Sequence, residues 1–288
     1  MQFTNWAKRP AGQRKTGDLL TNLGADFFRL LDALTIARAR KHVQKYYQHE
    51  MVRLGGFPKR ERPLAKYVDI DLAGRFMPYD RLSKEIEGYT LSLFNPSRFV
   101  LPEHRSLYER KVGNFSQATR EGFLIGMMKV NFLKRLESSV HAFALTMKRT
   151  IEKIETLEQR LRTFQTAAER FPELNLESTD LADVEDEELR DALQVGKGLT
   201  FRTAHLNVAD WLLALQHDKQ QLDVLYTQAS AVKAPRDAKL QALKQLIADK
   251  VSQPPTDKRG QPNRKVLIFT ASADTAVYLY WTFDKRLT

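Results

Sequence analysis

The stretch FLIGMMKVNFLKRLESSVHAFALTMKRTIEKIETLEQRLRTF, residues 123–164, is the part of the sequence that decides the fold. Apolar residues recur along it at steps of three and four, which places them on one face of a helix. They are Leu133, Leu136, Val140, Phe143, Met147, Ile151, Ile154, Leu157, Leu161 and Phe164. The charged residues between them, including Arg135, Arg149 and Glu158, predict a solvated opposite face. An unbroken helix of this length would be roughly 60 Å long, at about 1.5 Å per residue.

Such a helix exceeds the span of a small domain and must brace other elements. The same spacing also fits a coiled-coil dimerisation rod. We favour a brace whose apolar face packs on residues 204–251 of the same chain. A break is expected near Gly122 or Gly126, because glycine is a poor helix former.

The rest of the chain reads mainly as helix. Helices are predicted at residues 18–34, 36–54, 78–94, 204–230 and 237–251, and a short strand at residues 67–72. Gly55-Gly56-Phe57-Pro58 should end the second of these helices. The segment 173–191 carries nine acidic residues and one basic residue, and we interpret it as a partly mobile insert. Trp211 and Phe143 are expected in the core and not as base-stacking platforms.

Residues 265–270, KVLIFT, differ from everything before them. A short, continuously apolar, β-branched run is typical of a strand buried in a parallel sheet. A helix is predicted to follow at residues 272–283. Since a buried strand needs neighbours for its backbone groups, we expect this βα unit to pair with something outside the chain or with a second copy. The fold class is therefore mainly α, a long-helix bundle or helical hairpin insertion with a C-terminal βα unit from an incomplete lobe.

The charge of the chain favours a polyanionic partner. Its 288 residues include 46 Lys and Arg against 35 Asp and Glu, for a net charge of +11. Residues 1–66 alone hold fourteen basic and five acidic residues. Nucleic acid is the default partner for such a distribution, although a merely basic protein remains the alternative. The sequence lacks cysteine, a secretory signal and an apolar run long enough to cross a bilayer, and we predict a cytoplasmic protein without membrane contact.

Motifs for intrinsic catalysis are missing from the sequence. It contains no G-x-x-x-x-G-K-[ST] phosphate loop, no acidic Mg²⁺ motif after an apolar strand and no G-x-S-x-G elbow. The six histidines show no metal-binding spacing. We expect no metal site, no cofactor held by this chain and no catalytic residue.

Three segments, in order, carry a resemblance to a known family. They are residues 34–42 (LTIARARKH), residues 237–243 (DAKLQAL) and residues 264–270 (RKVLIFT) with the following residues 273–279. The first resembles the arginine-rich stretch late in the first motor lobe of Swi/Snf-type superfamily 2 helicases. The second is similar to the short helix before the second motor lobe, and the third to the strand and helix that open that lobe, called motif IV. Residues 132–139 (FLKRLESS) also look like bacterial members of this group.

The resemblance implies the middle of an ATP-driven translocase on duplex nucleic acid. Residues 1–62 would end the first RecA-like lobe, residues 63–255 would form a helical insertion, and residues 256–288 would begin the second lobe. ATP and Mg²⁺ are implied for the parent protein, bound by motifs that lie outside these 288 residues. The chain should not hydrolyse ATP by itself. The alternative is a helical scaffold that binds a protein partner, and self-association through the helical face or the unpaired strand stays open.

Five residues are candidates for nucleic-acid contact. Arg38, Arg40 and Lys41 supply cationic groups for phosphate, with carboxylate pairing inside a lobe as the alternative. Thr270 and Ser272 follow the predicted strand, where open α/β sheets place ligand-binding groups. The resemblance implies that their hydroxyls donate to a backbone phosphate. Helix capping is the other interpretation of Ser272.

Overall fold

The computed structural model describes residues 40–53, 55–57, 62–109, 117–166, 173–175, 200–257 and 260–284, with seven isolated positions before residue 28. It divides the chain into two compact units, Met1–Ala65 and Lys66–Thr288. The helix predicted at residues 18–34 and most of the acidic segment lie outside the described residues.

The described residues of the first unit include two short helices, α4 (Arg40–Tyr46) and α5 (Gln48–Arg53), separated at Tyr47. Gly55 and Gly56 then adopt φ values of 74° and 71°, a left-handed conformation that glycine accepts without strain. The Gly56 amide donates to the Met51 carbonyl at 2.6 Å. The helix therefore ends at the glycine pair, as the sequence predicts.

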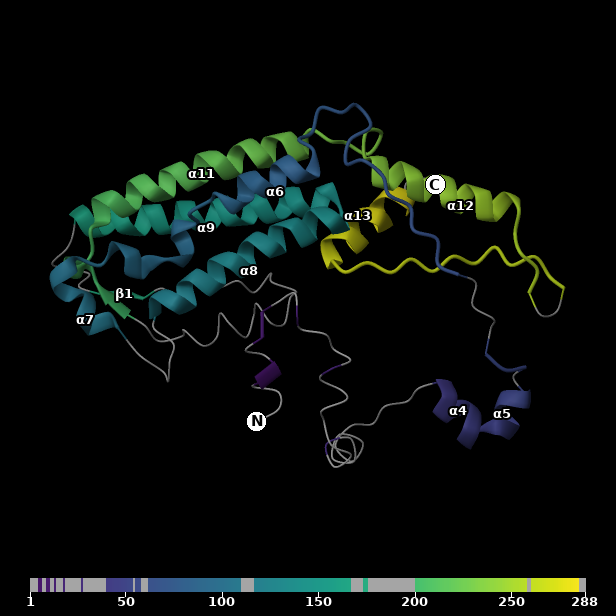
Figure 1. Cartoon of the computed structure of the whole chain (residues 1–288). Helices are drawn as coiled ribbons and strands as arrows, with labels where there is room; N and C mark the ends of the chain where they lie inside the picture. Colours follow the sequence, from purple (N-terminus) through teal and green to yellow (C-terminus); the bar gives the residue numbers. More distant parts are fainter. Residues whose placement is uncertain are drawn as a thin grey trace. The chain divides into compact units, whose positions relative to one another are not determined.

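Three long helices build the second unit: α8 (Gln117–Ser138), α9 (Val140–Thr166) and α11 (Val208–Ser230). α9 packs along α11 on one side and against α8 on the other (Figure 1). Of the ten apolar residues that open the sequence analysis, eight are buried, and Leu133 and Phe164 are partly buried against the same core. Trp211 and Phe143 are fully buried. The mainly helical fold, and packing of the long apolar face on α11, are confirmed.

The prediction of a single long helix is wrong, because the helix is interrupted at Ser139, between α8 and α9. Gly122 and Gly126, where a break was expected, lie inside α8. The Ser139 hydroxyl accepts the Ala142 amide at 3.0 Å and so caps α9. The prediction of a solvated face is also wrong at two positions, because Arg135 and Glu158 are only 5% and 7% exposed.

The helix predicted at residues 78–94 is shorter than expected. α6 (Tyr79–Glu87) ends before Gly88, where the Gly88 amide donates to the Glu85 carbonyl and the Tyr89 amide donates to the Ile86 carbonyl, each at 3.1 Å. Leu91 then takes a φ of 50° and leads into buried 3₁₀ turns, so the helical path is not continued. The turns and the short helix that follow are η2 (Ser92–Phe94), η3 (Pro96–Phe99), η4 (Pro102–His104) and α7 (Arg105–Tyr108).

The strand predicted at residues 67–72 is absent from the structure. Tyr67 and Val68 are 96% and 45% exposed, and the segment makes one isolated bridge, between Asp71 and Asp237. The Asp71 carboxylate accepts backbone N–H groups from Ala73, Arg75 and Phe76. These hydrogen bonds hold the chain in a turn, and the segment therefore does not form the hydrogen-bonded ladder of a strand.

A small antiparallel sheet lies at another edge of the unit. β1 (Glu173–Asn175) pairs with β2 (Thr200–Arg202), with Leu174 opposite Phe201. η5 (Thr203–His205) follows directly. The Arg202 amide donates to the Tyr108 hydroxyl at 3.0 Å, which fixes the sheet on α7.

The last two helices are α12 (Ala238–Ser252) and α13 (Ala273–Asp284), close to their predicted bounds. Between them, residues 265–270 are extended but pair with no described strand. Leu267 and Phe269 are 83% and 90% exposed, so the expected burial of this segment is not met within the described residues. Within the same described part of the chain, no helix has the length and apolar character needed to cross a bilayer.

Candidate functional site at the junction of α8, α9 and α13

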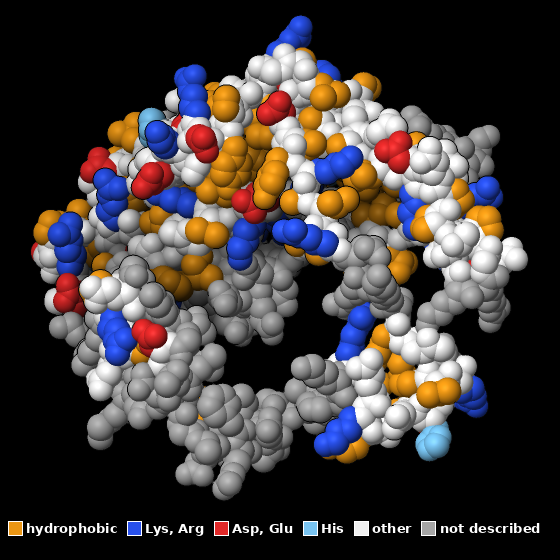
Figure 2. All heavy atoms as spheres, turned by 45° about the vertical axis from the view of Figure 1, so that its right-hand side comes forward, with side chains coloured by type: hydrophobic (Ala, Val, Ile, Leu, Met, Phe, Trp, Pro, Cys, Tyr) orange, Lys and Arg blue, Asp and Glu red, His pale blue; other side chains and the backbone are white. Residues whose placement is uncertain are grey.

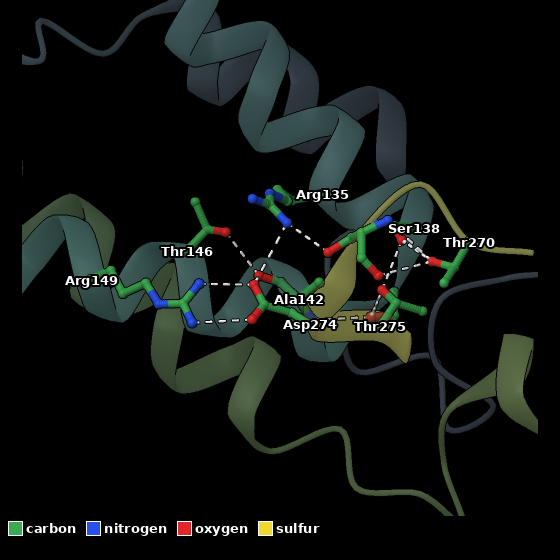
Figure 3. Close-up of polar contacts among 10 residues, drawn as sticks. Arg135, Ser138, Ala142, Thr146, Arg149, Thr270, Asp274 and Thr275 are labelled. Atoms are coloured by element: carbon green, nitrogen blue, oxygen red, sulfur yellow. Dashed lines mark hydrogen bonds and ion pairs between the residues drawn. The ribbon is translucent and has the colours of Figure 1, made fainter. Parts of the chain in front are cut away.

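Two of the five predicted site residues lie together. Thr270 and Ser272 form the turn that leads into α13, beside the break between α8 and α9 (Figure 3). Arg40 and Lys41 belong to the first turn of α4 in the other unit. The exposed Arg40 places its guanidinium carbon 4.9 Å from the centre of the Phe57 ring, a cation–π contact. Arg38 lies outside the described residues.

Two arginines share one carboxylate at this junction. Asp274, in the first turn of α13, accepts Arg149 through both of its oxygens, at 2.8 and 3.0 Å. Arg135 lies 3.6 Å from the same carboxylate, and its Nη1 donates to the Ser272 hydroxyl at 2.6 Å. A buried guanidinium needs a compensating charge, and Asp274 helps to offset the cost of burying Arg135.

A chain of hydroxyl groups runs next to this ion pair. Ser139 lies 2.8 Å from Thr275, Thr275 lies 2.7 Å from Ser138, and Ser138 lies 3.3 Å from Thr270. At one end Ser139 accepts the Ala142 amide. At the other end Thr270 donates to the Ser272 carbonyl at 3.2 Å.

Each hydroxyl has one hydrogen, so the Thr270 end fixes every donor in between. The Thr270 hydrogen is committed to the Ser272 carbonyl, and Ser138 must therefore donate to Thr270. Thr275 then donates to Ser138, and Ser139 donates to Thr275. The result is one directed chain from the cap of α9 to the turn before α13, in which the bonds polarise one another in the same sense.

This arrangement changes the expectation for the two turn residues. Ser272 is only 3% exposed, and its hydroxyl contacts Arg135. The Thr270 hydroxyl donates to the protein backbone. With these bonds in place, the Thr270 hydroxyl has no hydrogen left for a phosphate, and the buried Ser272 hydroxyl is not accessible to one. The Ser272 carbonyl accepts the Ala276 amide at 3.1 Å, the first hydrogen bond of α13, and helix capping by the Ser272 hydroxyl stays a prediction.

A second set of contacts ties α13 to α12. The Asp237 carboxylate caps α12 by accepting the Leu240 amide at 2.9 Å and accepts the Tyr278 hydroxyl at 3.1 Å. The Tyr278 ring stacks on His141 of α9, with centroids 4.6 Å apart. Burial, then the Asp237 carboxylate, raises the pKa of Tyr278 above its ordinary value. Burial lowers the pKa of His141, which favours the neutral imidazole in this stack.

An open groove of about 770 Å³ adjoins the junction, between the end of α8, α12, residues 268–272 and α13. Its apolar lining includes Leu240, Leu243, Leu246, Ile268, Phe269 and Leu279. The exposed charged side chains at its edge are Lys66, Lys134, Lys239 and Glu137. In the described residues, no group of three or more His, Asp or Glu side chains is placed to hold a metal ion. The arrangement can position a turn and bind a partner surface.

Arg135, Arg149, Asp274, Ser138 and Ser139 are the important residues that the sequence analysis missed. One signal was available. Ser138-Ser139 places two strong helix-capping residues inside an otherwise continuous helical pattern, and such a pair predicts a helix start. The role of Arg135 had no comparable local signal, because its partners are more than 130 positions further along the chain.

In comparisons with protein-family models, with curated proteins and with solved structures, nothing matches this chain.

Proposed function

We propose that this chain is the inter-lobe segment of a Swi/Snf-type superfamily 2 helicase or translocase. In this proposal a helical region precedes the strand and helix that open the second RecA-like lobe, and the segment contributes to duplex nucleic-acid binding without catalysing a reaction alone. The observation that carries the proposal is the arrangement of residues 265–284. An extended apolar segment is followed by a helix whose first turn is anchored on α8 and α9 through Asp274.

That arrangement supports the proposal because the extended segment offers what a sheet requires. Its apolar side chains are exposed, and no described residue pairs with its backbone. Strands of a motor lobe outside these 288 residues would pair with that backbone. The same lobes would supply the ATP and Mg²⁺ sites, and we place the parent protein in the cytoplasm.

Nucleic-acid contact is assigned in this proposal chiefly to the basic residues Arg38, Arg40 and Lys41. Cationic side chains supply the sequence-independent part of such binding. The stacking of Arg40 on Phe57 leaves guanidinium hydrogens at its edge available for phosphate. Thr270 and Ser272 would contact a phosphate only after their present hydrogen bonds rearrange.

Two assays on the purified chain test the proposal. Binding to a fluorescein-labelled 20-base-pair duplex should be detected at low salt and should weaken steeply as salt rises. ATP turnover, with and without the duplex, should stay at background. Turnover above background would overturn the assignment as a non-catalytic segment, and absence of duplex binding at low salt would overturn the nucleic-acid role.

The second candidate, a scaffold for a protein partner, is favoured by one observation. The groove beside the junction exposes apolar side chains that nucleic acid would not cover.

A further inference from the structure

The groove between α12 and the turn before α13 leaves large apolar side chains in water. Phe269 is 90% exposed, and Leu246 and Ile268 are each 42% exposed. Figure 2 brings this side of the molecule forward and shows hydrophobic side chains gathered among charged side chains of both signs. Contiguous apolar surface of this kind on a soluble protein marks an interaction site.

The edge of the groove is positive. Three of its four exposed charged residues are lysines, Lys66, Lys134 and Lys239. The fourth, Glu137, already accepts the Tyr79 hydroxyl at 2.9 Å. The other lining carboxylate, Asp237, is 3% exposed and is engaged by Leu240 and Tyr278. An occupant is therefore favoured if it carries negative charge.

The wall formed by α12 sets the shape of the occupant. Leu240, Leu243 and Leu246 follow one another at steps of three, which makes a ridge on the helix surface. A second amphipathic helix packs on such a ridge with its own apolar residues spaced at three and four. An apolar floor of this kind does not match a phosphate backbone, and a second copy would bring the same lysines against each other.

We propose that this groove binds an acidic amphipathic helix of a protein partner. The apolar face of that helix would cover Leu243, Leu246 and Phe269, and its carboxylates would lie near Lys134 and Lys239. The proposal is independent of nucleic-acid binding, and either one can fail alone.

The test is selection of a displayed library of random 16-residue peptides on the purified chain. The enriched peptides should be acidic, with apolar residues at i, i+3, i+4 and i+7. Leu246→Asp should weaken binding of a synthetic enriched peptide at least about tenfold, and Lys239→Glu should weaken it as well. The matched control is Val224→Asp on α11, where the wild-type side chain is 51% exposed outside the groove, and it should bind as the wild type does.

Several results would overturn the proposal. Enrichment of basic peptides would do so, as would enriched peptides that bind Leu246→Asp as well as they bind the wild type. A dimer of the chain that Leu246→Asp dissociates would identify a second copy as the occupant. Loss of duplex binding in Leu246→Asp would identify nucleic acid instead. The helical circular dichroism and melting temperature of each variant confirm that it is folded.

Discussion

Arg149 and Asp274, 125 positions apart in the chain, form a two-point ion pair with N–O distances of 2.8 and 3.0 Å. Asp274 also lies 3.6 Å from the buried Arg135. One carboxylate on α13 thus holds one arginine from α8 and one from α9. Asp274 therefore links α13 to both helices.

Replacing the shared carboxylate should therefore be costly. Asp274→Ala removes a carboxylate that pairs with both the buried guanidinium of Arg135 and that of Arg149, and we expect a loss of roughly 3 kcal/mol in the free energy of unfolding. The control is Glu152→Ala, whose wild-type pair with Lys148 is more than half exposed on both sides. That change should cost about 0.5 kcal/mol or less. Urea unfolding measures both, and equal effects would contradict the role given to Asp274.

The directed hydroxyl chain predicts coupling between its members. Ser139→Ala removes the cap of α9 and should cost about 1 kcal/mol. Thr275→Val keeps the cap but interrupts the chain, at about 1 kcal/mol for the lost hydrogen bonds. Because the two hydroxyls share one chain, the double variant should lose less stability than the sum of the single variants. Thermal unfolding of the three variants tests this, and strict additivity would show that no such chain operates.

The indole N–H of Trp211 should contribute to stability beyond its packing. It donates to the Ser92 carbonyl at 3.0 Å in the core, while the ring stacks on Phe99. Trp211→Phe leaves that buried carbonyl without this donor, at a cost of about 1–3 kcal/mol. Trp281→Phe is the matched control, because Trp281 is 58% exposed on α13 and should be replaceable at little cost. Chemical unfolding followed by circular dichroism gives both values, and comparable losses would contradict the assignment.

Asp71 predicts how stability depends on pH. The Arg236 guanidinium, more than the three backbone amides, holds the pKa of this carboxyl well below its ordinary 3.8. A depressed carboxyl pKa stabilises the fold at all pH values above about 3.8 and loses that effect as the pH falls below it. Arg236→Gln should therefore lower stability at pH 7, and its difference from the wild type should shrink on acidification below about pH 4.

Unfolding in urea at pH 7, 5 and 3 measures that difference. Arg75→Gln is the control, since Arg75 contributes its backbone amide, not its side chain, to the Asp71 turn. A difference between Arg236→Gln and the wild type that grows as the pH falls from 7 to 3 would contradict the sign of the argument.

The core was predictable because it follows local periodicity. Steps of three and four placed Leu136 on the buried face of α8 and Val140 to Leu161 on that of α9, and they identified Trp211 and Phe143. The ends of helices were less predictable. Ser139, not a glycine, breaks the long helix, because a hydroxyl that caps a backbone amide competes with continuation.

The polar junction was not predictable, because it depends on contacts between distant parts of the chain. Arg135 looks like one more surface charge until Asp274 and Ser272 are placed beside it. Asp71 likewise sits in an alternating pattern typical of a strand, yet its carboxylate bonds with Arg236 and the following turn override that pattern. Tyr67 is left almost fully exposed as a result.

The most direct test of the nucleic-acid role is a salt titration of duplex binding. For the wild-type chain, the logarithm of the binding constant should fall linearly with the logarithm of salt concentration between about 50 and 300 mM. The double variant Arg40→Gln with Lys41→Gln should reduce the magnitude of this log–log slope by up to about 2, since each phosphate contact contributes roughly 0.9 to it. Lys148→Gln with Lys244→Gln removes the same charge elsewhere and should leave the slope nearly unchanged. A wild-type chain that fails to bind the duplex at 50 mM salt, or a slope equally affected by both pairs, would contradict the account.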